Sequence, residues 1–264
     1  MARHHWSRTQ LFAFLGLSSA LCLMVFSIFF NGYVTASAVV SNTPELTVEL
    51  QNEVTPYDVV PNLTHPLLSV TSSFDFDSDD SYQRFLNNDR PFKDLTYVPV
   101  DLAPINSNFT ANNARKFQLR QVAGDAFADM AWHFRDEFKG DRLLIFSAYR
   151  SKAYQDGLLK AGCNKNACAK GGTSEHQAGL AVDLRVMTKG GKSISMDTPN
   201  KYTDWLHAHA QEWGFHNTYQ RGVAIDGKIV EGRHWRYMGV ELATLLRQNG
   251  QTIAEYYKAL GIRN

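Results

Sequence analysis

Apolar residues in the middle of the chain follow two different spacings. Between residues 117 and 138 they recur at roughly helical intervals, which predicts a helix that Asn112 or Asn113 caps. The continuous apolar runs 143–148 and 180–186 are typical of largely buried strands. This mixture predicts an α+β domain with a small, mainly antiparallel sheet that is flanked by helices.

The remainder of the domain carries further helix and turn signals. Ser151 is a suitable cap for a helix of about ten residues, and Pro199 suits the first position of a helix that ends before Gly214. Asp226-Gly227 lies between two short apolar stretches and predicts a β-hairpin. Two amphipathic helical stretches are expected to close the chain, residues 240–248 and 252–260.

Residues 1–38 have the composition of an export segment. Arg3 and Arg8 supply the positive start, residues 11–30 are mostly apolar, and Ala36-Ser37-Ala38 fits a cleavage site. The apolar run is long for a signal peptide and nearly long enough to span a bilayer, so a cleaved signal peptide and a retained anchor are both open. Either outcome places the rest of the chain outside the cytoplasm, in the periplasm or cell envelope.

Prolines recur among Ser, Thr and Asn in residues 39–80, where no regular spacing of apolar residues persists. This composition predicts an extracytoplasmic linker and leaves residues 81–264 as the folded domain. The net charge of +1 and the hydrophobic content of 44% indicate a globular protein and give no sign of nucleic-acid binding. We expect a monomer, held at the membrane through residues 11–30 if that segment is not cleaved.

Two cysteines of the predicted domain, Cys163 and Cys168, are separated by four residues. Outside the cytoplasm such a pair favours a disulfide that closes a short loop. A zinc-binding pair is the alternative, but no other cysteine of the domain could complete a cysteine-rich ligand set. The loop leads toward Ser174, which either caps the next turn or binds substrate.

Three residues from two distant segments form a candidate metal site. Gly179 permits a tight bend between His176 and Asp183, and His234 follows much later in the chain. Asp183 lies in the apolar run 180–186, where an unpaired charge is costly and metal coordination would remove that cost. Two imidazoles, one carboxylate and one open position suit a single catalytic Zn²⁺ per chain. In the alternative, Asp183 pairs with an arginine and His176 is a loop histidine.

Glu231 is the candidate general base, because a carboxylate that is not itself a ligand can take a proton from the water at a catalytic metal. Residues three apart on a straight strand point to opposite faces, so Gly232 is expected to introduce a bulge or bend before His234. Arg150 follows a predicted strand and is expected to grip a substrate carboxylate or the developing oxyanion. A plain surface ion pair is the alternative for Arg150.

These residues also carry a family resemblance. The pattern S-x-H-x-x-G-x-A-x-D at residues 174–183, followed by E-x-x-H at residues 231–234, resembles the zinc D-alanyl-D-alanine carboxypeptidases of the VanY type. That group belongs to a wider fold family that includes the hedgehog signalling domain. The upstream S-x-Y-R-S at residues 147–151, with Gln155 shortly after, is similar to a third segment of the family. One position departs from the pattern: Arg233 stands where relatives often carry Trp.

The resemblance implies removal of the terminal D-alanine from peptidoglycan stem peptides, which are therefore the expected partners. It also implies substrate contacts from Arg150, Gln155, Ser174 and Tyr219, although Gln155 is alternatively an exposed helix residue and Tyr219 a packing residue. Because Arg233 departs from the pattern, cleavage of an L,D bond and an endopeptidase activity stay open. A hypothesis of another class is a non-catalytic, zinc-stabilised module that binds wall peptides.

Overall fold

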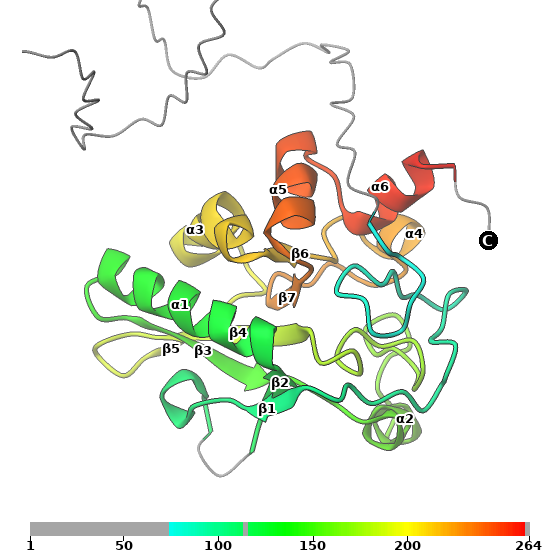
Figure 1. The fold of residues 1–264 in the computed structure, drawn as a ribbon. Helices are drawn as coiled ribbons and strands as arrows, with labels where there is room; N and C mark the ends of the chain where they lie inside the picture. Colours follow the sequence, from blue (N-terminus) through cyan, green and yellow to red (C-terminus); the bar gives the residue numbers. More distant parts are fainter. Residues whose placement is uncertain (1–73, 113–115, 262–264) are drawn as a thin grey trace, which may run out of the picture. The chain divides into compact units, whose positions relative to one another are not determined.

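The computed structural model describes residues 74–112 and 116–261 (Figure 1). The predicted export segment and the linker up to residue 73 lie outside the described residues. Within the described part of the chain, no helix combines the length and the apolar character needed to cross a bilayer.

An antiparallel sheet forms the centre of the domain and confirms the predicted α+β class (Figure 1). Its strands run in the order β3-β4-β7-β6, and β5 also pairs with β4. Their bounds are β3 Arg142–Ser147, β4 Ala181–Met187, β5 Ser193–Ser195, β6 Phe215–Asn217 and β7 His234–Tyr237. A separate antiparallel pair consists of β1 Leu102–Pro104 and β2 Gln118–Arg120.

Strand β4 lies inside the sheet, and one of its two faces is entirely aliphatic. Val182, Leu184 and Val186 are fully buried in the main hydrophobic cluster, which is the burial that a continuous aliphatic run predicts. Antiparallel pairing with β7 places Asp183 directly opposite His234. Directly opposed residues of neighbouring strands project from the same face, so this register brings two candidate metal ligands together.

Helices pack on and around this sheet. Helix α1 lies alongside β3 in Figure 1 and buries Phe127, Met130 and Phe134 in the main cluster. The helices are α1 Gln121–Glu137, α2 Lys152–Lys160, α3 Lys201–His209, α4 Val223–Asp226, α5 Val240–Asn249 and α6 Ile253–Ala259, with short 3₁₀ turns at Ser107–Phe109 and Ala210–Trp213. Ser151 caps α2 by accepting a hydrogen bond from the Tyr154 backbone N–H, as expected for a serine at that position.

A second hydrophobic cluster joins the first described residues to α5 and α6. Phe76 and Phe85 are buried there with Leu242, Ile253 and Tyr257, and Phe85 stacks on Tyr257 with ring centroids 4.7 Å apart. Residues 74–80, which the sequence analysis assigned to the linker, therefore contribute to the packing of the folded domain.

Three local predictions were wrong. The helix expected after residue 112 begins only at Gln121, because residues 118–120 pair with β1 instead. The expected hairpin is the short helix α4, since the Asp226 carboxylate accepts backbone N–H groups of the preceding turn and Gly227 ends the helix in a left-handed conformation. Pro199, which was expected at the first position of a helix, lies outside α3. That helix begins at Lys201, and Asn200 caps it through a capping box.

Candidate active site

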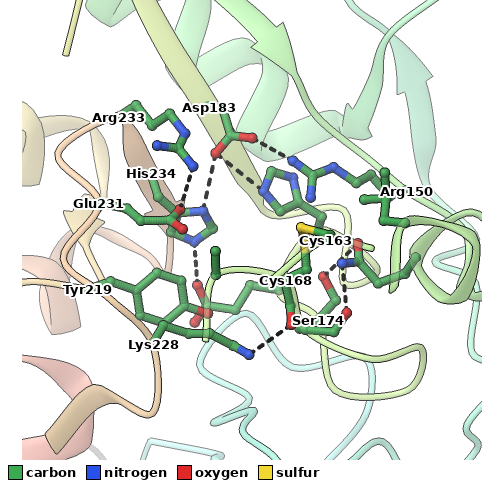
Figure 2. A pocket seen from close by; sticks show the side chains of 16 residues that line it. Arg150, Cys163, Cys168, Ser174, Asp183, Tyr219, Lys228, Glu231, Arg233 and His234 are labelled. Atoms are coloured by element: carbon green, nitrogen blue, oxygen red, sulfur yellow. Dashed lines mark hydrogen bonds and ion pairs between the residues drawn. A yellow bond between two sulfur atoms is a disulfide. The ribbon is translucent and has the colours of Figure 1, made fainter. Parts of the chain in front are cut away.

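His176, Asp183 and His234 converge in the structure, as the sequence analysis expected. One side-chain nitrogen or oxygen from each residue lies within 4.8 Å of the other two, and all three residues are buried. Asp183 Oδ1 is 3.5 Å from His176 Nε2 and 3.4 Å from His234 Nδ1 (Figure 2). His176 reaches this point because the chain turns sharply at Gly179, whose φ of +67° disfavours other residues.

The nitrogen of each imidazole that faces away from this centre has its own hydrogen-bond partner. His176 Nδ1 is 2.8 Å from the Ala148 carbonyl oxygen, and His234 Nε2 is 2.8 Å from Glu175 Oε2. If these outer nitrogens carry the hydrogens, the inner nitrogens of both rings are left with free lone pairs. Metal-binding histidines are held in this way in proteins, so the donor set fits a divalent cation.

The two histidines differ in their affinity for protons. Burial and the nearby Arg150 charge lower the pKa of His176 to about 4. Burial also disfavours a charged His234, but hydrogen bonds to Asp183 and Glu175 outweigh it and raise the pKa of His234 to about 9. A cation at the centre of the three residues would replace the proton that His234 otherwise holds between the carboxylates of Asp183 and Glu175.

Glu175 is the site residue that sequence reasoning missed. Its side chain is almost fully buried, and its second oxygen, Oε1, is 2.8 Å from Arg236 Nη1. Although burial opposes ionisation, Arg236 and His234 lower the pKa of Glu175 to about 2. Arg236 in turn donates to the Tyr82 and Arg84 carbonyl oxygens. The sequence gives only a weak signal for this pair: Glu175 stands within the 174–183 motif, and Arg236 follows His234 by two residues.

Glu231 lies beside the three residues, at the start of a tight turn. The His234 backbone N–H donates to the Glu231 carbonyl oxygen over 3.2 Å. Asn217 Nδ2 donates to the carbonyl oxygens of Glu231 and His234. A Cβ atom at Gly232 would lie 2.2 Å from the Met196 carbonyl oxygen, so only glycine fits this turn. The expected bend at Gly232 is therefore present, and Glu231 lines the same cavity as His234.

The Glu231 carboxylate is buried, and its two oxygens differ in their partners. Oε2 is 3.3 Å from Arg233 Nη2, whereas Oε1 is buried without a hydrogen-bond partner among the described residues. Burial raises the pKa of Glu231 from its usual range. A buried acceptor without a partner is costly, which makes Oε1 the position where a ligand or water would be stabilised.

Arg150 is paired with a candidate metal ligand. Its Nη2 is 2.5 Å from Asp183 Oδ2, and its Nε donates to Ser147 Oγ over 2.9 Å. The alternative of a plain surface ion pair does not describe this contact, since the Asp183 side chain is only 5% exposed. Arg150 also lines the cavity, and among the described residues only the Nε and Nη2 of its guanidinium have hydrogen-bond partners.

Gln155 and Ser174 line the cavity, but their side chains are hydrogen-bonded to each other, and Gln155 is also hydrogen-bonded to the backbone. Gln155 Nε2 donates to the Ala169 carbonyl oxygen over 2.7 Å, and Gln155 Oε1 accepts from Ser174 Oγ over 3.4 Å. Gln155 is thus buried rather than exposed on its helix. Tyr219 stacks on the His234 ring, with centroids 4.6 Å apart. These contacts hold the loop and the imidazole in place.

Cys163 and Cys168 form a disulfide that belongs to the cavity wall (Figure 2). Lys228 fastens this loop to the opposite wall, because its Nζ donates to the Lys165 and Cys168 carbonyl oxygens, each over 3.0 Å. The Ile229 backbone N–H donates to the Asn166 carbonyl oxygen over 2.8 Å. The disulfide loop and the segment before Glu231 therefore hold each other around a cavity of about 160 Å³.

Residues 116–240 match the family model of VanY, described as D-alanyl-D-alanine carboxypeptidase. A D-alanyl-D-alanine carboxypeptidase of Enterococcus faecalis is 36% identical over 109 residues, which are 41% of this chain and 38% of that protein. YodJ of Bacillus subtilis is 29% identical over 174 residues, or 61% of this chain and 62% of that protein. The chain thus spans less than two thirds of the length of either relative.

Two solved structures share the fold. The structure of the LdcB LD-carboxypeptidase is 25% identical, with a TM-score of 0.61 over 68% of this chain and 87% of that chain. The structure of VanYB in complex with D-alanine-D-alanine is 24% identical, with a TM-score of 0.52 over 66% of this chain and 96% of that chain. Residues 116–240 thus match the VanY family model, and the chain shares its fold with these two structures.

Proposed function

We propose that this chain is a zinc-dependent D-alanyl-D-alanine carboxypeptidase that hydrolyses the terminal amide of peptidoglycan stem peptides. The observation that carries the proposal is the shared cavity: His176, Asp183 and His234, whose ligand atoms cluster, line it together with Glu231, which has an unpartnered Oε1. The VanY domain and the Enterococcus faecalis relative support this reaction.

His176, Asp183 and His234 would hold the zinc, since two imidazole nitrogens and one carboxylate oxygen are ligands that zinc prefers. Bound there, zinc would polarise the scissile carbonyl group and make a water molecule acidic enough to react near neutral pH. Arg150 orients Asp183 through its 2.5 Å hydrogen bond. Its free edge is placed to bind a carboxylate or a developing negative charge.

Glu231 moves the proton in this proposal. Its Oε1 has no competing partner, so it can accept a proton from an attacking water and return it to the leaving amine. The raised pKa of Glu231 favours uptake of that proton. Arg233 holds the other oxygen and so fixes the orientation of the carboxylate. Tyr219 keeps the His234 ring from rotating by stacking on it.

We also place the domain outside the cytoplasm, held at the membrane only if the N-terminal segment is retained. The disulfide supports this location, because such bonds persist in oxidising compartments. Outside the cytoplasm the domain would have access to a substrate in the cell wall.

Cleavage of an L,D bond is the second candidate activity. The LdcB structure, with a TM-score of 0.61, is that of an LD-carboxypeptidase. Both reactions would use the same metal ligands and the same base. They differ in the configuration of the residue whose carbonyl group is attacked, and product analysis separates them.

The test uses the full chain, purified in detergent because residues 11–30 are apolar. Elemental analysis should find one zinc per chain, and mass spectrometry should show loss of one D-alanine from a stem pentapeptide. Glu231→Gln should retain zinc and lose roughly a hundred- to ten-thousandfold in rate. Glu212→Gln, a change at an exposed glutamate, is the matched control and should leave the rate unaltered. A zinc-loaded Glu231→Gln protein with the wild-type rate would remove Glu231 as the base.

A further inference from the structure

A second cavity adjoins the candidate active site. It has a volume of about 230 Å³, and its lining includes Arg185, Ser193, Ser195, Asp197 and Arg233. Arg233 lines both cavities. A substrate that extends from the metal-binding residues past Arg233 would therefore enter this second space.

Arg185 lies on the same side of the sheet as Asp183, because residues two apart on a strand share a face. The rise of a strand places the two side chains roughly 7 Å apart along β4. Arg185 stacks over Phe146 with its guanidinium carbon 4.6 Å from the ring centroid. Among residues 74–112 and 116–261, no carboxylate or carbonyl oxygen pairs with it, and its Nε is buried without a partner.

The charge in the second cavity is unbalanced. Arg233 is already bound to Asp197 Oδ1 over 2.6 Å and to Glu231 Oε2 over 3.3 Å. Asp197 is thus used by Arg233, and Arg185 is left as a half-buried cation. A half-buried guanidinium without an anion is an unfavourable arrangement that a bound carboxylate would relieve, with bidentate geometry available.

The position of this cation relative to the metal-binding residues indicates which part of a substrate it meets. Arg150 and Arg233 lie on opposite sides of Asp183 in Figure 2. If Arg150 takes the terminal carboxylate of a peptide, the Arg233 side receives the residues on the N-terminal side of the scissile bond. The second cavity then faces the part of the stem peptide that precedes the bond.

We propose that Arg185, flanked by Arg233, forms a subsite for a carboxylate group of the stem peptide on the N-terminal side of the scissile bond. This inference rests on the proposed function, since it assigns a feature of the same substrate. Stem peptides can offer such a group in two places: the side chain of a third-position diaminopimelate residue, or the α-carboxylate of a second-position γ-linked D-glutamate. Arg185 is a specificity residue in either case, since it binds the substrate away from the reacting atoms.

The experiment compares three synthetic pentapeptides with zinc-loaded full-length protein. The first has both carboxylates, the second has lysine in place of diaminopimelate, and the third has the D-glutamate α-carboxylate as an amide. Wild type should show a kcat/KM roughly ten- to a hundredfold lower for the peptide that lacks the recognised carboxylate. Which of the two altered peptides is poorer identifies the source of the carboxylate.

Arg185→Gln should remove this preference by lowering kcat/KM for the preferred peptide alone. The matched control is Arg135→Gln, because Arg135 also stacks over an aromatic ring, Trp132, but lines a different cavity. The control should keep the wild-type preference. Equal rates of wild type on all three peptides, or an equal loss for Arg185→Gln on all three, would overturn the subsite.

Failure of the proposed function has a different signature. If none of the peptides is hydrolysed, the carboxypeptidase proposal falls, and calorimetric binding of the same peptides then decides the subsite by itself. The subsite would be supported if the affinity of wild type fell by roughly tenfold or more when the peptide lost one carboxylate, and if Arg185→Gln bound the peptides with and without that carboxylate equally. Equal binding of all three would refute it.

Discussion

Glu175→Gln is the substitution that should show how the candidate metal site is held in place. Glu175 joins His234 Nε2 and Arg236 Nη1 through its two oxygens, each over 2.8 Å. The change removes the negative charge but keeps the size of the side chain. It leaves Arg236, which is fully buried, without its counter-ion.

The expected loss of stability follows from the pKa of Glu175. A fall from 4.5 to about 2 on folding corresponds to roughly 3 kcal/mol of preferential stabilisation of the carboxylate. Loss of one partner of a buried ion pair typically costs about 3–5 kcal/mol. We therefore expect the free energy of unfolding of metal-free Glu175→Gln to fall by about 3 kcal/mol at pH 7.

The effect should depend on pH in a defined direction. Because the pKa of Glu175 is lower in the folded state, its contribution is present above about pH 4.5 and is lost as the pH falls toward 2. Urea unfolding of wild type and Glu175→Gln at pH 7 and at lower pH measures the difference. The two unfolding curves should approach each other as the medium becomes acidic.

The same substitution should also weaken metal binding. An amide oxygen at position 175 would accept a weaker hydrogen bond from His234, so the imidazole would be a poorer ligand. Loss of such a partner lowers metal affinity by roughly ten- to a hundredfold, which competition with a chromophoric chelator measures. Glu231→Gln is the matched control, since that carboxylate is also buried but burial raises its pKa. If Glu175→Gln matched wild type in unfolding free energy and zinc affinity, the network would have no such role.

Three further predictions address other parts of the domain. Zinc affinity should rise about tenfold per pH unit from pH 7 to about 9, because zinc must displace the proton that the raised pKa keeps on His234; chelator competition across pH tests this. Gly232→Ala should lower the free energy of unfolding by about 3 kcal/mol or more, because its Cβ would clash with the Met196 carbonyl oxygen. Gly124→Ala, at a helical position with space for a Cβ, should raise that free energy slightly, and urea unfolding measures both. Replacing both Cys163 and Cys168 by serine should cost about 2 kcal/mol in thermal unfolding, and an unchanged Tm would contradict this.

The sequence was sufficient where the signal lies within a few residues. The aliphatic run around Asp183 predicted a buried strand, and Gly232 predicted the bend that turns Glu231 and His234 toward one cavity. It was insufficient where one residue type serves two structures. Asp226-Gly227 predicted a hairpin turn, but the same pair is compatible with a helix end, and the two backbone N–H groups that reach the Asp226 carboxylate decide between them.

Long-range partners explain the remaining misses. The segment before Gln121 has helix-compatible apolar spacing, but its backbone pairs with β1, a strand that local periodicity does not identify. Glu175 stands between two motif residues and looks like a solvent-exposed loop residue in the sequence. Its place in the site depends on Arg236, sixty-one residues later in the chain, and no local pattern connects the two.

Each carboxylate around His234 is paired with its own arginine, and the pairing separates their roles. Both oxygens of Glu175 are used by His234 and Arg236, and both oxygens of Asp183 face either Arg150 or the two histidines. Glu175 and Asp183 are therefore held in fixed positions as ions. Glu231 alone of the three retains an oxygen without a partner, with Arg233 on the other. An arginine anchors each carboxylate, but only Glu231 keeps an oxygen free to gain and lose a proton during a reaction, which is why we propose Glu231, and not its neighbours, as the base.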